Sequence, residues 1–190
     1  MRFLLYNIRY AAGIGKNFHL PLPYSGYLKK TDVNLSRIVD FIKYTEPDII
    51  GLVEVDSGSF RSGNSNQAEI VANELNYNHI FQSKYSEDSA ASKVPVLNKQ
   101  GNAVLAKATI ITNKFHYFNE GVKRLVIETE LKDLTFFLSI FPWNTGTDNI
   151  SYNTFTALLR TLKNQSFWRV ILMPLWEKKS MNSFWLQLDW

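Results

Sequence analysis

Residues 46–63 read Glu-Pro-Asp-Ile-Ile-Gly-Leu-Val-Glu-Val-Asp-Ser-Gly-Ser-Phe-Arg-Ser-Gly, and this stretch decides the fold. Its apolar run follows Pro47-Asp48 and ends before a Gly/Ser cluster, a pattern typical of a strand buried on both faces. The charge of Glu54 falls where we expect that strand to end. A carboxylate beside a core needs a cation, hydrogen-bond donors or water, and open sheets place ligands at the C-terminal ends of their strands. Glu54 is therefore the first candidate for chemistry.

The composition limits the classes of protein to consider. A chain of 190 residues with 45% apolar content can bury the core of one domain. The absence of cysteine excludes disulfides, thiolate nucleophiles and zinc-thiolate sites. Lys and Arg exceed Asp and Glu by 21 to 17, which suits an anionic ligand without identifying nucleic acid. We find no membrane segment and no signal-peptide pattern, so we expect a cytoplasmic protein.

The segments around residues 46–63 predict alternating strands and helices. Arg2 to Tyr10 has the apolar and aromatic bias of a first strand, with Asn7 and Arg9 on the same face. Thr31 or Asp32 can cap a helix that Pro47 ends. A second helix is predicted by an apolar face at Ala68, Val71, Ala72 and Leu75.

The pattern changes to period two in the second half. We expect strands at 77–82, 102–107, 125–131, 134–140 and 170–173, a polar loop at 83–100, and a third helix around 155–162. The short turn at Lys132-Asp133 indicates antiparallel pairing of the two strands that flank it. The sequence therefore predicts an α/β (α+β) protein with a mixed, largely antiparallel sheet under helices.

Three motifs in this order resemble the endonuclease/exonuclease/phosphatase superfamily of metal-dependent phosphoesterases. They are Tyr6-Asn7-Ile8-Arg9, Pro47-Asp48-Ile49-Ile50-Gly51-Leu52-Val53-Glu54 and Gly101-Asn102-Ala103-Val104-Leu105. The resemblance implies a four-layer β-sandwich flanked by helices, which we place at residues 1–173. It also implies a Mg²⁺ or Mn²⁺ site in which Glu54 is a direct ligand and Asn7 lies beside the metal.

The residue types suit such a site. Mg²⁺ prefers oxygen ligands, keeps several waters and is often bound by one or two carboxylates plus substrate phosphate. Arg9 or Arg61 can contact a phosphate oxygen. For Arg61, the alternative is a solvated loop residue. For Glu54, the alternative to a metal ligand is a structural ion pair.

The second half of the family's active site is missing. In the family the last strands run into a His, a Gly-Asp-x-Asn motif and an Asp-His pair, whereas here they run into Phe141-Pro142-Trp143 and Pro174-Leu175-Trp176. All five tryptophans follow residue 142. We therefore expect a sandwich that is incomplete at the C-terminus, with an atypical tail at 174–190. Either the segments after Ile140 and after Met173 are translated out of the ancestral reading frame, with the helix around 157–163 still in frame between them, or the chain is an authentic truncated relative. Resequencing the coding DNA across these two junctions separates the two accounts.

Two functions stay open from the sequence. By lineage the chain is a Mg²⁺-dependent phosphoester hydrolase of nuclease or phosphatase type, and we expect the missing motifs to impair it. Its expected partner is a phosphorylated substrate, with nucleic acid as one candidate. The alternative is a catalytically inactive remnant that at most binds a metal or an anion. The sequence predicts neither the substrate nor the oligomeric state.

Overall fold

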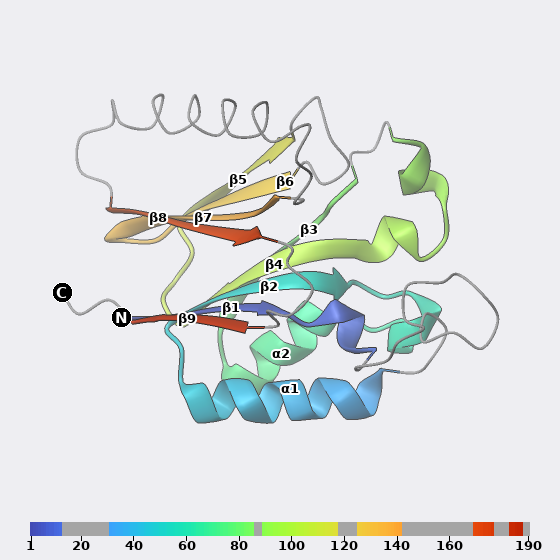
Figure 1. The fold of residues 1–190 in the computed structure, drawn as a ribbon, viewed down its shortest axis with the longest axis horizontal. Helices are drawn as coiled ribbons and strands as arrows, with labels where there is room; N and C mark the ends of the chain where they lie inside the picture. Colours follow the sequence, from blue (N-terminus) through green and yellow to red (C-terminus); the bar gives the residue numbers. More distant parts are fainter. Residues whose placement is uncertain (13–30, 86–88, 118–124, 142–168, 177–182, 188–190) are drawn as a thin grey trace. The chain divides into compact units, whose positions relative to one another are not determined.

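The computed structural model describes residues 1–12, 31–85, 89–117, 125–141, 169–176 and 183–187. They form two compact units, each with its own β-sheet (Figure 1). The first unit joins Met1–Ala108 to Asn182–Trp190, and the second unit is Thr109–Met181. The two sheets and the helices of the first unit confirm the predicted α/β class.

The first unit begins with a strand, a helix and a second strand. Strand β1 is Arg2–Asn7, helix α1 is Asp32–Thr45 and strand β2 is Ile49–Asp56. The two strands are parallel, and Phe3 lies opposite Ile49. Helix α1 ends at Thr45, and the next residue, Glu46, caps it in the left-handed conformation just before Pro47.

In the described residues, three more strands belong to the first sheet, and a second helix lies in the same unit. Helix α2 is Gln67–Leu75, β3 is Asn78–Ser83, β4 is Gln100–Ala106 and β9 is Ser183–Gln187. The sheet order is β3-β4-β2-β1-β9, so β2 lies at the centre. As predicted, β2 is buried on both of its faces.

Helices α1 and α2 pack on one face of this sheet. The core between them joins inward-facing residues of the strands to the apolar stripes that the helical period predicted. Its members include Leu4, Ile38, Ile42, Ile50, Leu52, Val71, Ala72 and Leu105. Because this core forms along most of the length of β2, the C-terminal end of β2 has a fixed position in the first unit.

The second unit contains a four-stranded sheet. Strands β5, β6, β7 and β8 are Thr112–Tyr117, Leu125–Glu130, Leu134–Phe141 and Arg169–Trp176, in that order across the sheet. The predicted antiparallel pairing of β6 and β7 is confirmed, and the turn between them is closed by a bond from the Leu131 N–H to the Leu134 carbonyl. β8 pairs with β7 in parallel.

Several boundaries differ from those predicted. β1 stops at Asn7 rather than Tyr10, and β2 continues two residues past Glu54. β8 continues through Pro174, which an edge strand tolerates because one side of its backbone needs no ladder bond. Residues 183–187, which have no strand pattern of their own, form β9. The predicted third helix lies outside the described residues.

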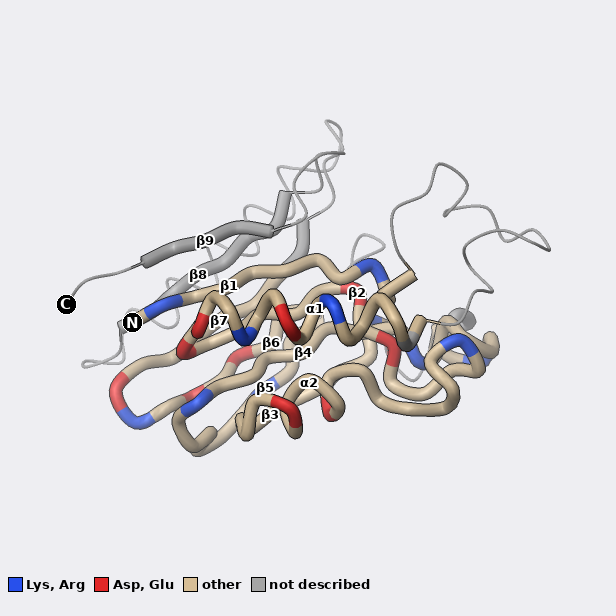
Figure 2. Tube along the Cα trace, turned by 90° about the horizontal axis from the view of Figure 1, so that it is seen from below, with Lys and Arg blue, Asp and Glu red and all other residues tan. Residues whose placement is uncertain are grey.

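Charged residues of both signs are spread along the described part of the chain (Figure 2). None of its helices is long and apolar enough to cross a membrane. Figure 2 shows Lys and Arg interspersed with Asp and Glu along the described trace. This distribution agrees with the small excess of basic residues in the sequence.

We predict that Gly101→Ala destabilises the first unit by about 3 kcal/mol, the upper range for overpacking a core. A Cβ at this position of β4 would lie 2.1 Å from the Gln82 carbonyl oxygen and 2.5 Å from the Phe81 ring. Gly63→Ala is the matched control, since a Cβ there meets nothing within 4 Å and only the φ of +60° opposes it. Urea unfolding should show a loss of about 1 kcal/mol for the control, and equal losses for both variants would contradict the prediction.

Candidate functional site at the C-terminal ends of β1 and β2

Glu54 lies at a β-bulge near the end of β2. The ladder between β2 and β4 pairs Leu52 with Ala103 and next pairs Val55 with Gly101, so two residues of β2 face one residue of β4. Glu54 itself has φ of +56°, a left-handed conformation that non-glycine residues rarely adopt. Bulges of this kind change the direction of a side chain and are frequent beside active sites.

Asn102 of β4 supports the backbone of this bulge. Its side chain is buried, with 2% exposed, and its Oδ1 accepts a hydrogen bond of 3.3 Å from the Glu54 N–H. The bulge removes this N–H from the regular ladder, so the amide of Asn102 takes the place of the missing strand carbonyl. Asn102 belongs to the third family-like motif, for which the sequence suggested no role.

Asn7 lies beside this bulge on the neighbouring strand. In the parallel register of β1 and β2, Asn7 is opposite Val53, and the Ile8 N–H donates to the Val53 carbonyl at 3.0 Å. The Asn7 Oδ1 accepts a bond of 2.9 Å from the Arg9 N–H. The structure therefore brings the two predicted metal-site residues, Asn7 and Glu54, to the same end of adjacent strands.

The segment after β1 forms an unusual left-handed turn. Arg9, Tyr10 and Ala11 have φ values of 49°, 57° and 53°. Each such residue costs about 1 to 2 kcal/mol, so the surroundings must hold the turn in place. The prediction that Arg9 shares a face of a strand with Asn7 is wrong, because the strand ends at Asn7 and this turn follows.

Arg61 lies in a buried ion pair with Asp56. Its side chain is 0% exposed, and its Nη2 lies 2.9 Å from the Asp56 Oδ2. The carboxylate of Asp56 also accepts bonds from the backbone N–H groups of Gly58 and Ser59. The guanidinium carbon of Arg61 lies 4.9 Å from the centre of the Tyr10 ring. The alternative of a solvated loop residue is therefore wrong, and the contacts of Arg61 hold the loop after β2 against the turn after β1.

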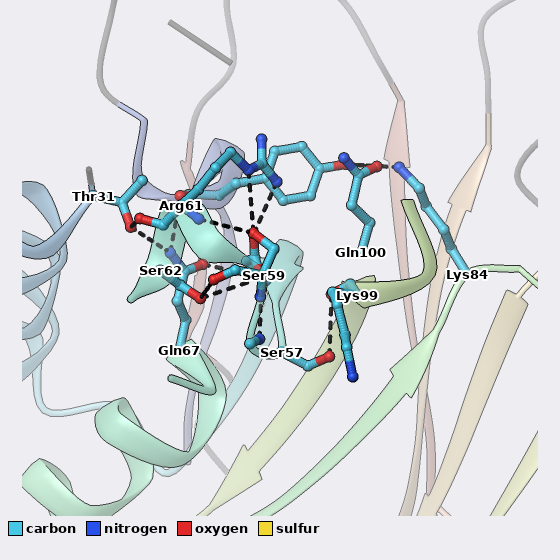
Figure 3. A network of polar contacts seen from close by, with 12 residues as sticks. Thr31, Ser57, Ser59, Arg61, Ser62, Gln67, Lys84, Lys99 and Gln100 are labelled. Atoms are coloured by element: carbon cyan, nitrogen blue, oxygen red, sulfur yellow. Dashed lines mark hydrogen bonds and ion pairs between the residues drawn. The ribbon is translucent and has the colours of Figure 1, made fainter. Parts of the chain in front are cut away.

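A polar network extends from this ion pair to β3 and β4 (Figure 3). Lys84, which follows β3, donates to the Tyr10 hydroxyl at 2.6 Å. That hydroxyl donates in turn to the Gln100 Oε1 at 3.0 Å. Figure 3 shows Lys84 and Gln100 on one side of the network and Thr31 and Gln67 on the other. The network thus joins the C-terminal ends of β1, β2 and β3 with the start of β4.

The donor atoms near Glu54 fit a hard divalent ion. Within the described residues, no hydrogen bond or ion pair involves the Glu54 carboxylate, and its side chain is partly exposed. Asn7 offers an amide oxygen with a second lone pair. No group of three or more His, Cys, Asp or Glu in the described part could form an all-protein cage. One carboxylate and one amide suit Mg²⁺, which keeps several of its waters.

The sequence identified part of this site. Asn7 and Glu54 were predicted from the strand ends and the family-like motifs. Tyr10, Gln67, Lys84 and Asn102 were assigned no role, because polar residues on separate segments give no periodic signal. For Asn102 the motif itself could have drawn attention to the role.

The fold is similar to that of several solved structures. The human Nocturnin catalytic domain has a TM-score of 0.56 and 18% identity, over 86% of this chain and 58% of that chain. An endonuclease/exonuclease/phosphatase family protein from Leptotrichia buccalis has a TM-score of 0.56 and 17% identity, over 88% of this chain and 63% of that one. Truncated TDP2 from Caenorhabditis elegans has a TM-score of 0.51 and 13% identity, over 89% of this chain and 59% of that chain.

This likeness lies in the fold, since no protein-family model and no curated protein matches the sequence itself. The chain spans about three-fifths of the length of the structures to which it is similar. Their shared architecture agrees with the resemblance that the three strand motifs indicated. The chain therefore has the fold of the endonuclease/exonuclease/phosphatase proteins.

Proposed function

We propose that this chain derives from a Mg²⁺-dependent phosphoester hydrolase and that Glu54 is its direct metal ligand, with Asn7 beside the ion. The observation that carries the proposal is the left-handed bulge at Glu54, which lies beside Asn7 at the ends of adjacent strands. Within the described residues, the carboxylate of Glu54 has no ion-pair or hydrogen-bond partner. Similarity in fold to a 3′-5′ exonuclease from Neisseria meningitidis, at a TM-score of 0.50, supports this class. Mn²⁺ is the alternative ion.

The residues suggest how a phosphorylated substrate would be held. A bound Mg²⁺ supplies a Lewis acid that polarises the phosphoryl oxygen and neutralises charge on the leaving oxygen. Glu54 and Asn7 would hold the ion at the strand ends. We assign the phosphate contact to Arg9, which is partly exposed and lies two residues after Asn7, rather than to Arg61, whose side chain is 0% exposed. A phosphorylated ligand, nucleic acid included, is the proposed partner of this site.

The alternative function is a catalytically inactive remnant that binds metal or an anion at the same residues. It is favoured by the ends of β7 and β8, where Phe141 lies opposite Trp176 and the next residues, Pro142-Trp143 and Glu177-Lys178, are neither a His nor a Gly-Asp-x-Asn motif. At these two strand ends the residues that the resemblance assigns to water activation are therefore replaced. Loss of a general base alone costs about 10²- to 10⁴-fold in rate, so we expect hydrolysis to be strongly impaired.

A hydrolysis assay on bis(4-nitrophenyl) phosphate separates these functions. We expect slow turnover with Mg²⁺ that stops with EDTA and in Glu54→Ala. Glu69→Ala, which changes an exposed carboxylate in the first turn of α2, is the matched control and should hydrolyse as the wild type does. Absence of turnover together with metal binding at Glu54 would support the inactive remnant. Turnover that survives in Glu54→Ala would contradict both functions.

A further inference from the structure

Gln67, the first residue of α2, joins three separate segments through its side chain. It is fully buried, with 0% exposed. Its Nε2 donates to the Tyr10 carbonyl at 2.9 Å and to the Thr31 Oγ1 at 3.2 Å. Its Oε1 accepts a bond of 3.0 Å from the Asp56 N–H. Both N–H groups and the oxygen of one amide are therefore used within the first unit.

Two of these segments carry the candidate metal ligands. Tyr10 lies three residues after Asn7, and Asp56 lies two residues after Glu54. Both segments contain left-handed backbone, at residues 9–11 and at Glu54. Such conformations persist where the surrounding structure imposes them. The amide of Gln67 connects one distorted segment directly to the other.

The left-handed turn at residues 9–11 also fixes the side chain of Asn7. The Asn7 Oδ1 accepts the Arg9 N–H, and Arg9 is the first residue of the turn. If the bond from Gln67 to the Tyr10 carbonyl were lost, the turn could relax and the Arg9 N–H would point away from Asn7. The Asn34 Nδ2 supports the same turn at the Ala11 carbonyl, at 3.0 Å, but it does not reach β2.

We propose that Gln67 is a positioning residue that holds the Asn7 and Glu54 segments at the separation that a divalent ion requires. This inference rests on the proposed metal site. Metal-ligand distances tolerate about 0.2 Å of error, and residues that orient ligands typically change metal affinity about 10- to 100-fold when they are replaced. Gln67 contacts neither ligand side chain, so it acts through the two backbones.

The test measures Mn²⁺ affinity by electron paramagnetic resonance in the intact chain. Gln67→Met keeps the length of the side chain but removes all three hydrogen bonds, and we expect its affinity to fall about 10- to 100-fold. Gln67→Glu keeps an oxygen acceptor for the Asp56 N–H but loses the donor to Tyr10, and its affinity should also fall. Ile42→Ala is the control for stability. Ile42 is a buried core residue of the first unit near the C-terminal end of α1, whereas the Gln67 partner Thr31 lies at the N-terminal end of that helix. This control should bind Mn²⁺ as the wild type does.

The outcomes separate this inference from the proposed function. Suppose that Glu54→Gln no longer binds Mn²⁺ but a folded Gln67→Met binds it with wild-type affinity. This result overturns the role of Gln67 and leaves the proposed metal site standing. An equal loss of affinity in Ile42→Ala also overturns the role of Gln67, because general destabilisation then explains the effect. A wild-type chain that binds no Mn²⁺ overturns both. If neither Gln67 variant folds, Mg²⁺ titration of the wild type should shift the NMR signals of the Gln67 Nε2–H and the Asp56 N–H with one midpoint, and unchanged signals would overturn the inference.

Discussion

Replacing Asp56 by alanine should destabilise the first unit by about 3 to 5 kcal/mol, the usual loss when one partner of a buried ion pair is removed. The guanidinium of Arg61 is 0% exposed and lies 2.9 Å from the Asp56 carboxylate. Without that carboxylate, the buried guanidinium loses its oppositely charged partner, and the N–H groups of Gly58 and Ser59 lose their acceptor. The shift in the midpoint of urea unfolding measures this loss.

An exposed ion pair supplies the matched control. Lys43 and Glu74 lie 2.7 Å apart, and their side chains are 46% and 54% exposed. Glu74→Ala should therefore change the midpoint very little, because water replaces the lost carboxylate. Combining Asp56→Ala with Arg61→Met should recover part of the stability, since it removes the buried charge that has lost its carboxylate partner. If Asp56→Ala costs no more than Glu74→Ala, the loop after β2 does not depend on this pair.

Replacing Glu54 by glycine should abolish divalent-metal binding without destabilising the fold. The substitution removes the carboxylate, and it also places at φ of +56° the residue that best tolerates that conformation. Relief of the left-handed strain offsets the conformational entropy that a glycine loses on folding. A residue that is unfavourable for the fold but required for binding is what we expect at a functional site.

Glu54→Ala separates the side chain from the backbone. It loses the carboxylate as Glu54→Gly does, but it keeps a Cβ in the left-handed conformation. Both variants should fail to bind metal, and the alanine variant should be less stable than the glycine variant by about 1 kcal/mol. Thermal and urea unfolding of the two proteins give this difference directly. An alanine variant more stable than the glycine variant would show that Glu54 is not strained.

The elements with a strong local pattern could be predicted from the sequence. The apolar run of β2 and the helical periods of α1 and α2 agree with the packing that these segments adopt, so local and tertiary preferences coincide. β9 could not be predicted, because residues 183–187 have no period of their own and gain their hydrogen bonds from the edge of β1. Strand propensity depends on such neighbours more than helix propensity does.

The candidate site was predictable only in its main residues. Glu54 was predicted from its place at the expected end of a buried strand, and Asn7 from the motif in β1. The left-handed turn at residues 9–11 contains no glycine or asparagine that would indicate it. This turn receives hydrogen bonds from distant side chains, such as that of Gln67. Neither these hydrogen bonds nor the burial of Arg61 leaves a pattern in the local sequence.

The most direct test of the central claim is a Mn²⁺ titration of the wild type and of Glu54→Gln, followed by electron paramagnetic resonance. Glutamine keeps the size and one oxygen of the side chain but removes the negative charge. We predict one bound ion per wild-type chain, which Mg²⁺ displaces, and none bound at this site in Glu54→Gln. Equal binding by the two proteins, or no binding by the wild type, would contradict the assignment of Glu54 as a metal ligand.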